Sequence, residues 1–150
     1  MQEGYALIPA TDADVNSWMA LVQTVGDNFP GLDIDAYQDM LLRNIHRQSA
    51  LCVKQGAQVV GVLLYSLNHQ TLSCMAVHPA HRRRGIGAAL VGKMLEDMPK
   101  DSDIWVSTFR EEDPWGTAPR ALYKRFGFVE DALTMEFDYP NQKFVLRRKG

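Results

Sequence analysis

The sequence His78-Pro-Ala-His-Arg-Arg-Arg-Gly-Ile-Gly-Ala-Ala-Leu90 carries the strongest structural signal in this chain. It follows an apolar run, Thr71–Val77, which predicts a buried strand. Apolar residues spaced four apart then predict one face of a helix, namely Ile86, Leu90, Met94 and Met98. A strand therefore ends, a turn of arginines and glycines follows, and a helix begins.

This turn has the chemistry of an anion-binding site. The free N–H groups of a helix start point outward, and the helix dipole there favours negative charge. Gly85 and Gly87 have no side chain that would keep a bulky anion from the backbone. Arg82, Arg83 and Arg84 add fixed positive charge and forked hydrogen-bond donors. The sequence therefore predicts a phosphate site, and a pyrophosphate is the ligand that suits it best.

Length and composition indicate one domain over residues 1–150, which is close to the commonest domain size. With 46% apolar and 23% charged residues the chain is not of the disordered class. A net charge of −2 gives no global attraction to nucleic acid or to an acidic membrane. The arginine run is one turn long and lacks interleaved aromatic residues, so no nucleic-acid partner is expected.

The termini, cysteines and histidines indicate a cytoplasmic protein without a metal. Residues 1–5 include an acid and no apolar signal region, and no apolar run approaches the roughly 20 residues that span a bilayer, so no membrane partner is expected. Cys52 and Cys74 lie in apolar runs and are expected to be reduced core residues. The histidines at positions 46, 69, 78 and 81 show no paired metal-ligand spacing.

The remaining patterns predict an α+β fold. Strands are expected at residues 5–8, 50–54, 59–67, 71–77, 104–109, 128–137 and 142–148. Helices are expected after Thr11 or Asp12 and at residues 34–47, 86–98 and 117–126. Gly127 fits a left-handed helix end with Phe128 as its apolar contact, and residues 138–141, Asp-Tyr-Pro-Asn, are predicted to be the loop between the last two strands.

Two segments resemble signatures of the GNAT superfamily of acyl-CoA-dependent N-acyltransferases. Residues 82–87, Arg-Arg-Arg-Gly-Ile-Gly, fit the cofactor-binding pattern Gln/Arg-x-x-Gly-x-Gly/Ala. Residues 121–128, Ala-Leu-Tyr-Lys-Arg-Phe-Gly-Phe, resemble the second signature, a helix that carries a tyrosine and ends at Gly-Phe. The two segments follow the order of the family, and the resemblance implies acetyl-CoA as the acyl donor.

The resemblance also implies the GNAT fold, a mixed and mostly antiparallel sheet of about seven strands with helices on both faces and the fourth and fifth strands splayed apart. Here those strands would be residues 71–77 and 104–109, with acyl-CoA in the gap. In the family the fourth strand is bulged and leaves N–H groups for the pantetheine arm and the thioester oxygen. The implied cofactor-binding residues are Met75, Ala76, Val77, Arg82, Arg83, Arg84, Gly85, Ile86, Gly87 and Ala88.

By the same resemblance, Tyr123 is the candidate general acid that protonates the departing thiolate. The reference pKa values of a phenol and a thiol, about 10 and about 8.5, are close enough for transient transfer, and a hydrogen bond alone stabilises developing charge. From the residues alone, a core tyrosine beside Leu122 and Phe126 on an amphipathic helix explains the pattern as well.

The candidate general base is Glu111. Family members often place a carboxylate on the fourth or fifth strand, but the corresponding residues here include Ser73, Cys74, Ser107 and Thr108. Glu111, and with it Glu112 or Asp113, comes just past the fifth strand and could reach an amine. The alternative for each is a solvated acidic loop, because charged loop residues are usually exposed. Cys74 as an acyl-accepting nucleophile is disfavoured, because no activating base is near it in sequence.

The predicted function is transfer of the acetyl group of acetyl-CoA to a primary amine by direct attack in a ternary complex. Many relatives carry an asparagine that touches CoA at the position of Gly116. That departure, with the missing strand carboxylate, keeps open the alternative of a non-catalytic acyl-CoA-binding or regulatory module. The acceptor, a small-molecule or peptide amine, and the oligomeric state, monomer or homodimer, stay open. Candidate acceptor-pocket residues are Trp18, Asp27, Phe29, Asp33, Tyr37, Tyr139 and Pro140.

Overall fold

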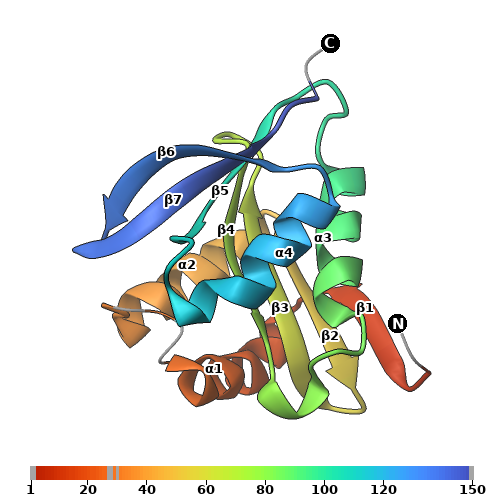
Figure 1. Ribbon diagram of the computed structural model, residues 1–150. Coiled ribbons are helices and arrows are strands. Elements are labelled where there is room, and N and C mark those ends of the chain that lie inside the picture. The colour runs from red at the N-terminus through yellow and green to blue at the C-terminus, as the bar shows by residue number, and fades with distance from the viewer. Residues whose placement is uncertain (1–2, 27–28, 30, 149–150) are drawn as a thin grey trace.

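The computed structural model describes residues 3–26, 29 and 31–148, which form a sheet with helices on both faces (Figure 1). The strands are β1 (Tyr5–Pro9), β2 (Ala50–Gln55), β3 (Gln58–Ser66), β4 (Thr71–Val77), β5 (Ile104–Phe109), β6 (Val129–Glu136) and β7 (Tyr139–Leu146). The helices are α1 (Val15–Thr24), α2 (Ile34–His46), α3 (Ile86–Asp97) and α4 (Thr117–Arg125). The predicted order of elements is confirmed. No helix in the described ranges is long and apolar enough to cross a bilayer.

The sheet has the strand order β1-β2-β3-β4-β5-β7-β6. All neighbouring strands are antiparallel except β4 and β5, which are parallel. These two strands pair only at Thr71 with Trp105 and at Leu72 with Val106, and beyond those residues they part. The predicted splay between the fourth and fifth strands is therefore confirmed.

Each face of the sheet carries its own hydrophobic core. One core joins α1 and α2 to the sheet through fully buried side chains such as Trp18 and Leu41. The other joins α3 and α4 to the opposite face, with Leu90, Met94 and Phe144 each 0% exposed. Two cores hold helices on both sides of the same strands, so any opening in the sheet lies between the two layers.

The first turn of α3 lies unusually close to the sheet, because β3 carries a glycine beneath it. A Cβ added at Gly61 would lie 2.4 Å from the Cγ2 atom of Ile86 and 3.4 Å from Leu90 Cδ1. Real Cβ atoms do not approach other carbons so closely. The missing side chain of Gly61 therefore sets how deeply the start of α3 is seated, and with it the position of the turn before it.

The turn between β6 and β7 differs from the sequence prediction. Phe137 and Asp138 form it, with φ of 52° and 61°, the two positive values of a type I′ hairpin. Tyr139 and Pro140 therefore belong to β7, where they pair with Glu136 and Met135, and the predicted loop over residues 138–141 is wrong. Pro140 lies beyond the last pair of β7 with β5, at Asn141, so its missing N–H costs no hydrogen bond to β5.

Candidate active site

A cavity of about 1060 Å³ lies where β4 and β5 part. One side is lined by α3, α4 and the turn before α3, and the other by α2 and the β6–β7 hairpin. The wall between them consists of β4 and the second half of β5, residues 71–77 and 106–109. Because α2 and α3 cover opposite faces of the sheet, the cavity passes from one face to the other.

The end of the cavity near α3 has the geometry of an anion site. Gly85 precedes the helix in the left-handed conformation, at φ 81°, and no side chain of the described residues caps the first N–H groups of α3. Arg82 and Arg83 line the cavity beside Gly85, and so do Gly87 and Ala88. Uncapped N–H groups and guanidinium groups therefore meet at one end of the cavity, as the sequence predicts.

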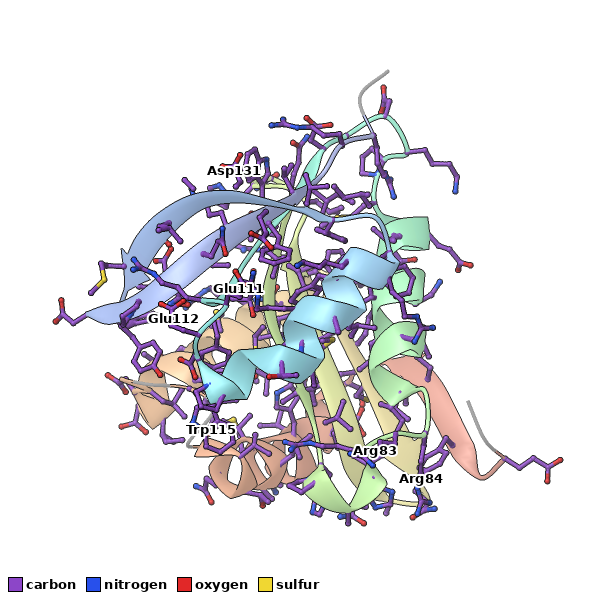
Figure 2. All side chains as sticks on the ribbon, viewed as in Figure 1. Arg83, Arg84, Glu111, Glu112, Trp115 and Asp131 are labelled. Carbon is purple, nitrogen blue, oxygen red and sulfur yellow. The ribbon has the colours of Figure 1, made fainter. Side chains whose placement is uncertain are left out.

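Arg84 is held differently from its two neighbours. Its Nη1 donates to the hydroxyl of Tyr5 at 3.0 Å, and that hydroxyl is 2.8 Å from Nδ1 of His81. Arg84 does not line the cavity, whereas Arg83, also labelled in Figure 2, does. The structure thus brings two of the three predicted arginines to the cavity, and the third contacts the first strand instead.

Gly87 and Ile86 serve the packing of α3 as well as the predicted site. A Cβ at Gly87 would lie 3.1 Å from Leu122 Cδ2, so this glycine lets α4 approach the first turn of α3. Ile86 is 2% exposed and faces the core, although it too borders the cavity. A large side chain at position 87 would therefore disturb α4 in addition to any bound anion.

Tyr123, on α4, lines the cavity. Its ring packs against Phe128 and Phe144, at 5.8 Å and 6.3 Å between ring centroids, and the residue is 4% exposed. Burial, and next the nearby Cys74 thiol, raise the pKa of Tyr123, so its hydroxyl keeps its proton at neutral pH. Among the described residues this hydroxyl has no hydrogen-bond partner.

The end of α4 fixes the position of this tyrosine. The N–H of Phe128 bonds to the carbonyl of Tyr123 at 3.1 Å, and the N–H of Gly127 bonds to that of Lys124 at 3.0 Å. Gly127 has φ of 95°, so these bonds form the Schellman motif predicted for this position. Tyr123 is thus both a core residue and part of the cavity wall, and the two interpretations of this residue are compatible.

The fourth strand offers backbone groups to the gap. Leu64 pairs with Cys74 and Tyr65 with Leu72, so the extra residue of a bulge is Ser73. Met75, Ala76 and Val77 pair with β3 on one edge, and in the described chain no strand pairs with them on the other. All three line the cavity. The backbone groups that face the gap thus come from the parting of β4 and β5, while the bulge lies nearer the start of the strand. One of them, the carbonyl of Val77, accepts from Nε of Arg82 at 3.4 Å.

A buried polar chain lies behind β4. Nε1 of Trp18 donates to the hydroxyl of Tyr37 at 3.0 Å, and that hydroxyl is 3.3 Å from Sγ of Cys74. Burial raises the pKa of the Cys74 thiol to about 11, so the sulfur is protonated at neutral pH. Cys74 and Tyr37 both line the cavity. The sequence contains no signal for this chain, because its members come from α1, α2 and β4.

The acidic loop after β5 stays outside the cavity. Glu111 and Glu112 are exposed, do not line it, and lie far from Arg83 and Arg84 in Figure 2. Asp113 accepts from the N–H of Trp115 at 3.0 Å and from the hydroxyl of Tyr139 at 2.6 Å, so it holds the loop against β7. The role of Glu111 as a base stays a prediction that this arrangement does not support.

The carboxylates that do line the cavity, among the described residues, are those of Asp33 and Glu136. Asp33 caps α2 and accepts from the N–H of Ala36 at 3.1 Å. Glu136 ends β6, and its Oε1 accepts from the hydroxyl of Ser107 on β5 at 3.4 Å. The sequence predicts Asp33 as one of several acceptor candidates and contains no signal for Glu136, because the hairpin brings Glu136 to β5 from almost thirty residues away.

Gly116 has a steric reason to be glycine. A Cβ there would lie 2.9 Å from Phe109 Cβ, 3.2 Å from the carbonyl oxygen of Arg110 and 3.2 Å from Cδ of Arg120. The residue is buried against the end of β5 and does not line the cavity. An asparagine side chain, which the family resemblance places at this position, therefore has no room here.

The predicted acceptor residues divide into three groups. Phe29, Asp33, Tyr37 and Tyr139 line the cavity. Trp18 is 0% exposed and lies behind Tyr37, and Pro140 does not line the cavity. Asp27 lies outside the described residues. Trp115, which sequence analysis does not single out, also borders the cavity and is 49% exposed.

Parted parallel strands, a cavity between them and a helix start beside two arginines are the features that the resemblance to the GNAT fold implies. The chain belongs to the GNAT acetyltransferase family, since the family model described as "Acetyltransferase (GNAT) domain" matches residues 46–130. No curated protein matches the chain.

Solved structures agree on the fold. A GNAT-family acetyltransferase from Bacillus cereus has a TM-score of 0.76 at 22% identity, covering 96% of this chain and 97% of that one. An N-acetyltransferase from Staphylococcus aureus has a TM-score of 0.75 at 15% identity, covering 97% and 99%. The yncA protein of Salmonella typhimurium, solved with its cofactor acetyl-CoA, has a TM-score of 0.74 at 14% identity, covering 97% and 94%.

Proposed function

We propose that this protein is an N-acetyltransferase that moves the acetyl group of acetyl-CoA to a primary amine by direct attack in a ternary complex. The observation that carries the proposal is the continuity of the cavity. It joins the anion site at α3, the free edge of β4, the Tyr123 hydroxyl and a pair of carboxylates. Membership of the GNAT family supports acetyl-CoA as the donor.

Backbone and guanidinium groups would hold the donor. The N–H groups at the start of α3, with Arg82 and Arg83, suit its pyrophosphate. The unpaired edge of β4 at residues 75–77 suits the pantetheine arm and the thioester oxygen, because N–H groups there stabilise a developing oxyanion. No metal ligand set is required for either contact.

The transfer needs one nucleophile and one proton donor. The neutral amine nitrogen attacks the thioester carbonyl carbon, the carbon–sulfur bond breaks, and an amide and a thiolate form. The amine loses a proton and the thiolate gains one, so acetyl-CoA and amine yield the acetylated amine and CoA. Tyr123 would donate a hydrogen bond to the sulfur, since its hydroxyl keeps its proton and the residue lines the cavity. The raised pKa of Tyr123 widens the gap to the thiol, so its main contribution would be to stabilise the developing thiolate by that hydrogen bond rather than to transfer the proton in full.

The protonation of Cys74 favours direct attack over a mechanism with an acetylated enzyme. Cys74 is the only cysteine among the described residues that lines the cavity. The raised pKa of Cys74 keeps it as a thiol, and its polar neighbour is Tyr37 rather than a base. Such a sulfur is a poor nucleophile. The amine therefore attacks the thioester itself, and both substrates must be bound together.

Release of free thiol from acetyl-CoA in the presence of pooled amines tests the function. Tyr123→Phe should lower kcat about 10²–10⁴-fold while the acetyl-CoA KM stays unchanged, because only the hydroxyl is lost. Its Tm should also stay unchanged, since that hydroxyl bonds to no described residue. Full activity in Tyr123→Phe would remove the residue from the mechanism. Acetyl-CoA binding without thiol release would favour the non-catalytic module.

A further inference from the structure

We infer that the acceptor amine carries a second positive charge, which Asp33 and Glu136 hold at the cavity end opposite the arginines. The inference rests on the proposed function, since it names the class of amine that the same cavity takes. Diamines and longer polyamines with a primary amino group are the chemical class. The two carboxylates are specificity-determining residues in this assignment, and the reacting nitrogen lies elsewhere, beside β4.

Charge is distributed unevenly along the cavity. Arg82 and Arg83 line one end, and the carboxylates of Asp33 and Glu136 line the other. Neither acid forms an ion pair with a described residue. Two uncompensated negative charges in one concave site favour a cation and disfavour an acceptor with its own carboxylate.

The two carboxylates come from segments that touch each other. A Cβ at Gly31 would lie 3.1 Å from Cβ of Phe137, so the tip of the β6–β7 hairpin contacts the segment before α2. Asp33 follows Gly31 by two residues, and Glu136 directly precedes Phe137. The hairpin therefore arches over this end of the cavity and brings Glu136 to the side where Asp33 begins α2.

Aromatic rings surround the same end. Phe29 and Tyr37 pack at 6.3 Å between centroids, and Phe109 and Tyr139 at 6.0 Å. All four border the cavity, together with Phe137. Ring faces attract ammonium groups, and a methylene chain packs well against them. A flexible diamine matches such a site better than a sugar or an anionic amino acid does.

A second feature of the cavity indicates where the reacting amino group would lie. The hydroxyl of Tyr123, on a residue 4% exposed, has no partner among the described residues and borders the same cavity. A ligand that presents one amino group to the thioester and a second to the carboxylates therefore fits the cavity. The unpartnered hydroxyl of Tyr123 thus adds an observation that is independent of the two carboxylates.

Kinetics with two matched amines test the assignment. Diaminobutane and butylamine have the same carbon chain and differ by one ammonium group, and 4-aminobutyrate has a carboxylate in place of the terminal aminomethyl group. We expect kcat/KM to fall in that order. Glu136→Gln keeps an acceptor for Ser107, and Asp33→Asn keeps the helix cap, so both variants should fold. Each should lower kcat/KM for diaminobutane about fivefold through KM, and the double variant should lower it further than either single variant.

Two substitutions serve as controls of equal charge. Asp35 lies in the first turn of α2 beside Asp33, and Asp131 lies on β6 with Glu136, at a distance from the hairpin tip (Figure 2). Both are exposed and neither lines the cavity. Asp35→Asn and Asp131→Asn should leave the preference for diaminobutane unchanged. Binding of diaminobutane to the CoA-saturated protein, measured by calorimetry, gives a readout that needs no turnover.

These experiments distinguish failure of the diamine assignment from failure of the proposed function. Thiol release with equal efficiency on butylamine and diaminobutane would overturn the inference and leave the proposed function in place. Calorimetric binding of diaminobutane that disappears in the double variant would support the inference even in the absence of turnover. A fall of kcat on butylamine in Glu136→Gln would place Glu136 in the chemistry and overturn its assignment as an anchor.

Discussion

Gly61→Ala should displace the anion site without changing any residue that borders it. The new Cβ would lie 2.4 Å from Ile86 Cγ2, about 1 Å closer than carbon atoms normally approach. Cγ2 is a branch at the Cβ of Ile86, so it can move only with the rotamer or with the first turn of α3. Overpacking of this kind costs about 1–3 kcal/mol, which corresponds to a Tm lower by roughly 2–12 °C.

The same displacement should weaken acetyl-CoA binding. A shift of about 1 Å lengthens N–H···O distances beyond the range of a good hydrogen bond. We expect the Kd for acetyl-CoA, measured by calorimetry, to rise about tenfold or more. Ile86→Ala removes Cγ2 and makes room, so the double variant should lose less unfolding free energy than the two single losses together.

Gly92→Ala is the matched control, because the same change on α3 meets open space. Alanine there should raise the unfolding free energy by about 0.5–1 kcal/mol through helix propensity, with acetyl-CoA affinity unchanged. Denaturant unfolding and calorimetry on both variants decide the matter. A Gly61→Ala protein as stable as the wild type, with wild-type affinity, would refute the argument that this glycine seats α3.

Four more substitutions test the roles of three arginines and the loss of stability at low pH. Arg83→Ala should raise the acetyl-CoA KM about tenfold, whereas Arg84→Ala should change it less than about twofold; equal effects in steady-state kinetics would contradict the assignment. Arg120→Met should lower the unfolding free energy by about 2 kcal/mol in denaturant titrations, because buried acceptors lose their donor; no loss would contradict this role. Burial alone would raise the pKa of Asp14, but the hydrogen bond from Lys54 helps to hold it below its ordinary value. Its stabilisation is therefore present at neutral pH and lost as the pH falls through that lowered pKa, so Tm curves of Asp14→Asn and wild type should converge at low pH; parallel curves would contradict this.

Local patterns explain most of the correct sequence predictions. The strand, turn and helix over residues 71–97 follow from apolar periodicity and two glycines, all of which act within a few residues. The left-handed end of α4 at Gly127 is equally local. In contrast, Asp-Tyr-Pro-Asn at residues 138–141 has the composition of a turn, yet its pairing with β6 moves the turn to Phe137 and Asp138.

The candidate site was less predictable, because the fold assembles it from distant segments. Glu136 faces Ser107 only because the last hairpin lies over β5, and sequence spacing contains no trace of that contact. Glu111 is close to β5 in sequence, but the loop carries it out to solvent. Gly116 shows the same limit, since the crowding that excludes a side chain comes from Phe109 and Arg120.

The cavity extends from one face of the sheet to the other, so the donor and the acceptor would bind on different faces. This arrangement affects how the reaction rate would depend on the cellular concentrations of acetyl-CoA and CoA. Under the proposed function, the product CoA would keep every contact with the arginines that acetyl-CoA makes, because the acetyl group lies at the opposite end of the CoA molecule from the pyrophosphate. The acceptor side of the cavity would stay accessible while CoA is bound, so an amine could bind there and form a dead-end complex with CoA. The rate of turnover would then depend on the ratio of acetyl-CoA to free CoA, so free CoA would act as an inhibitor.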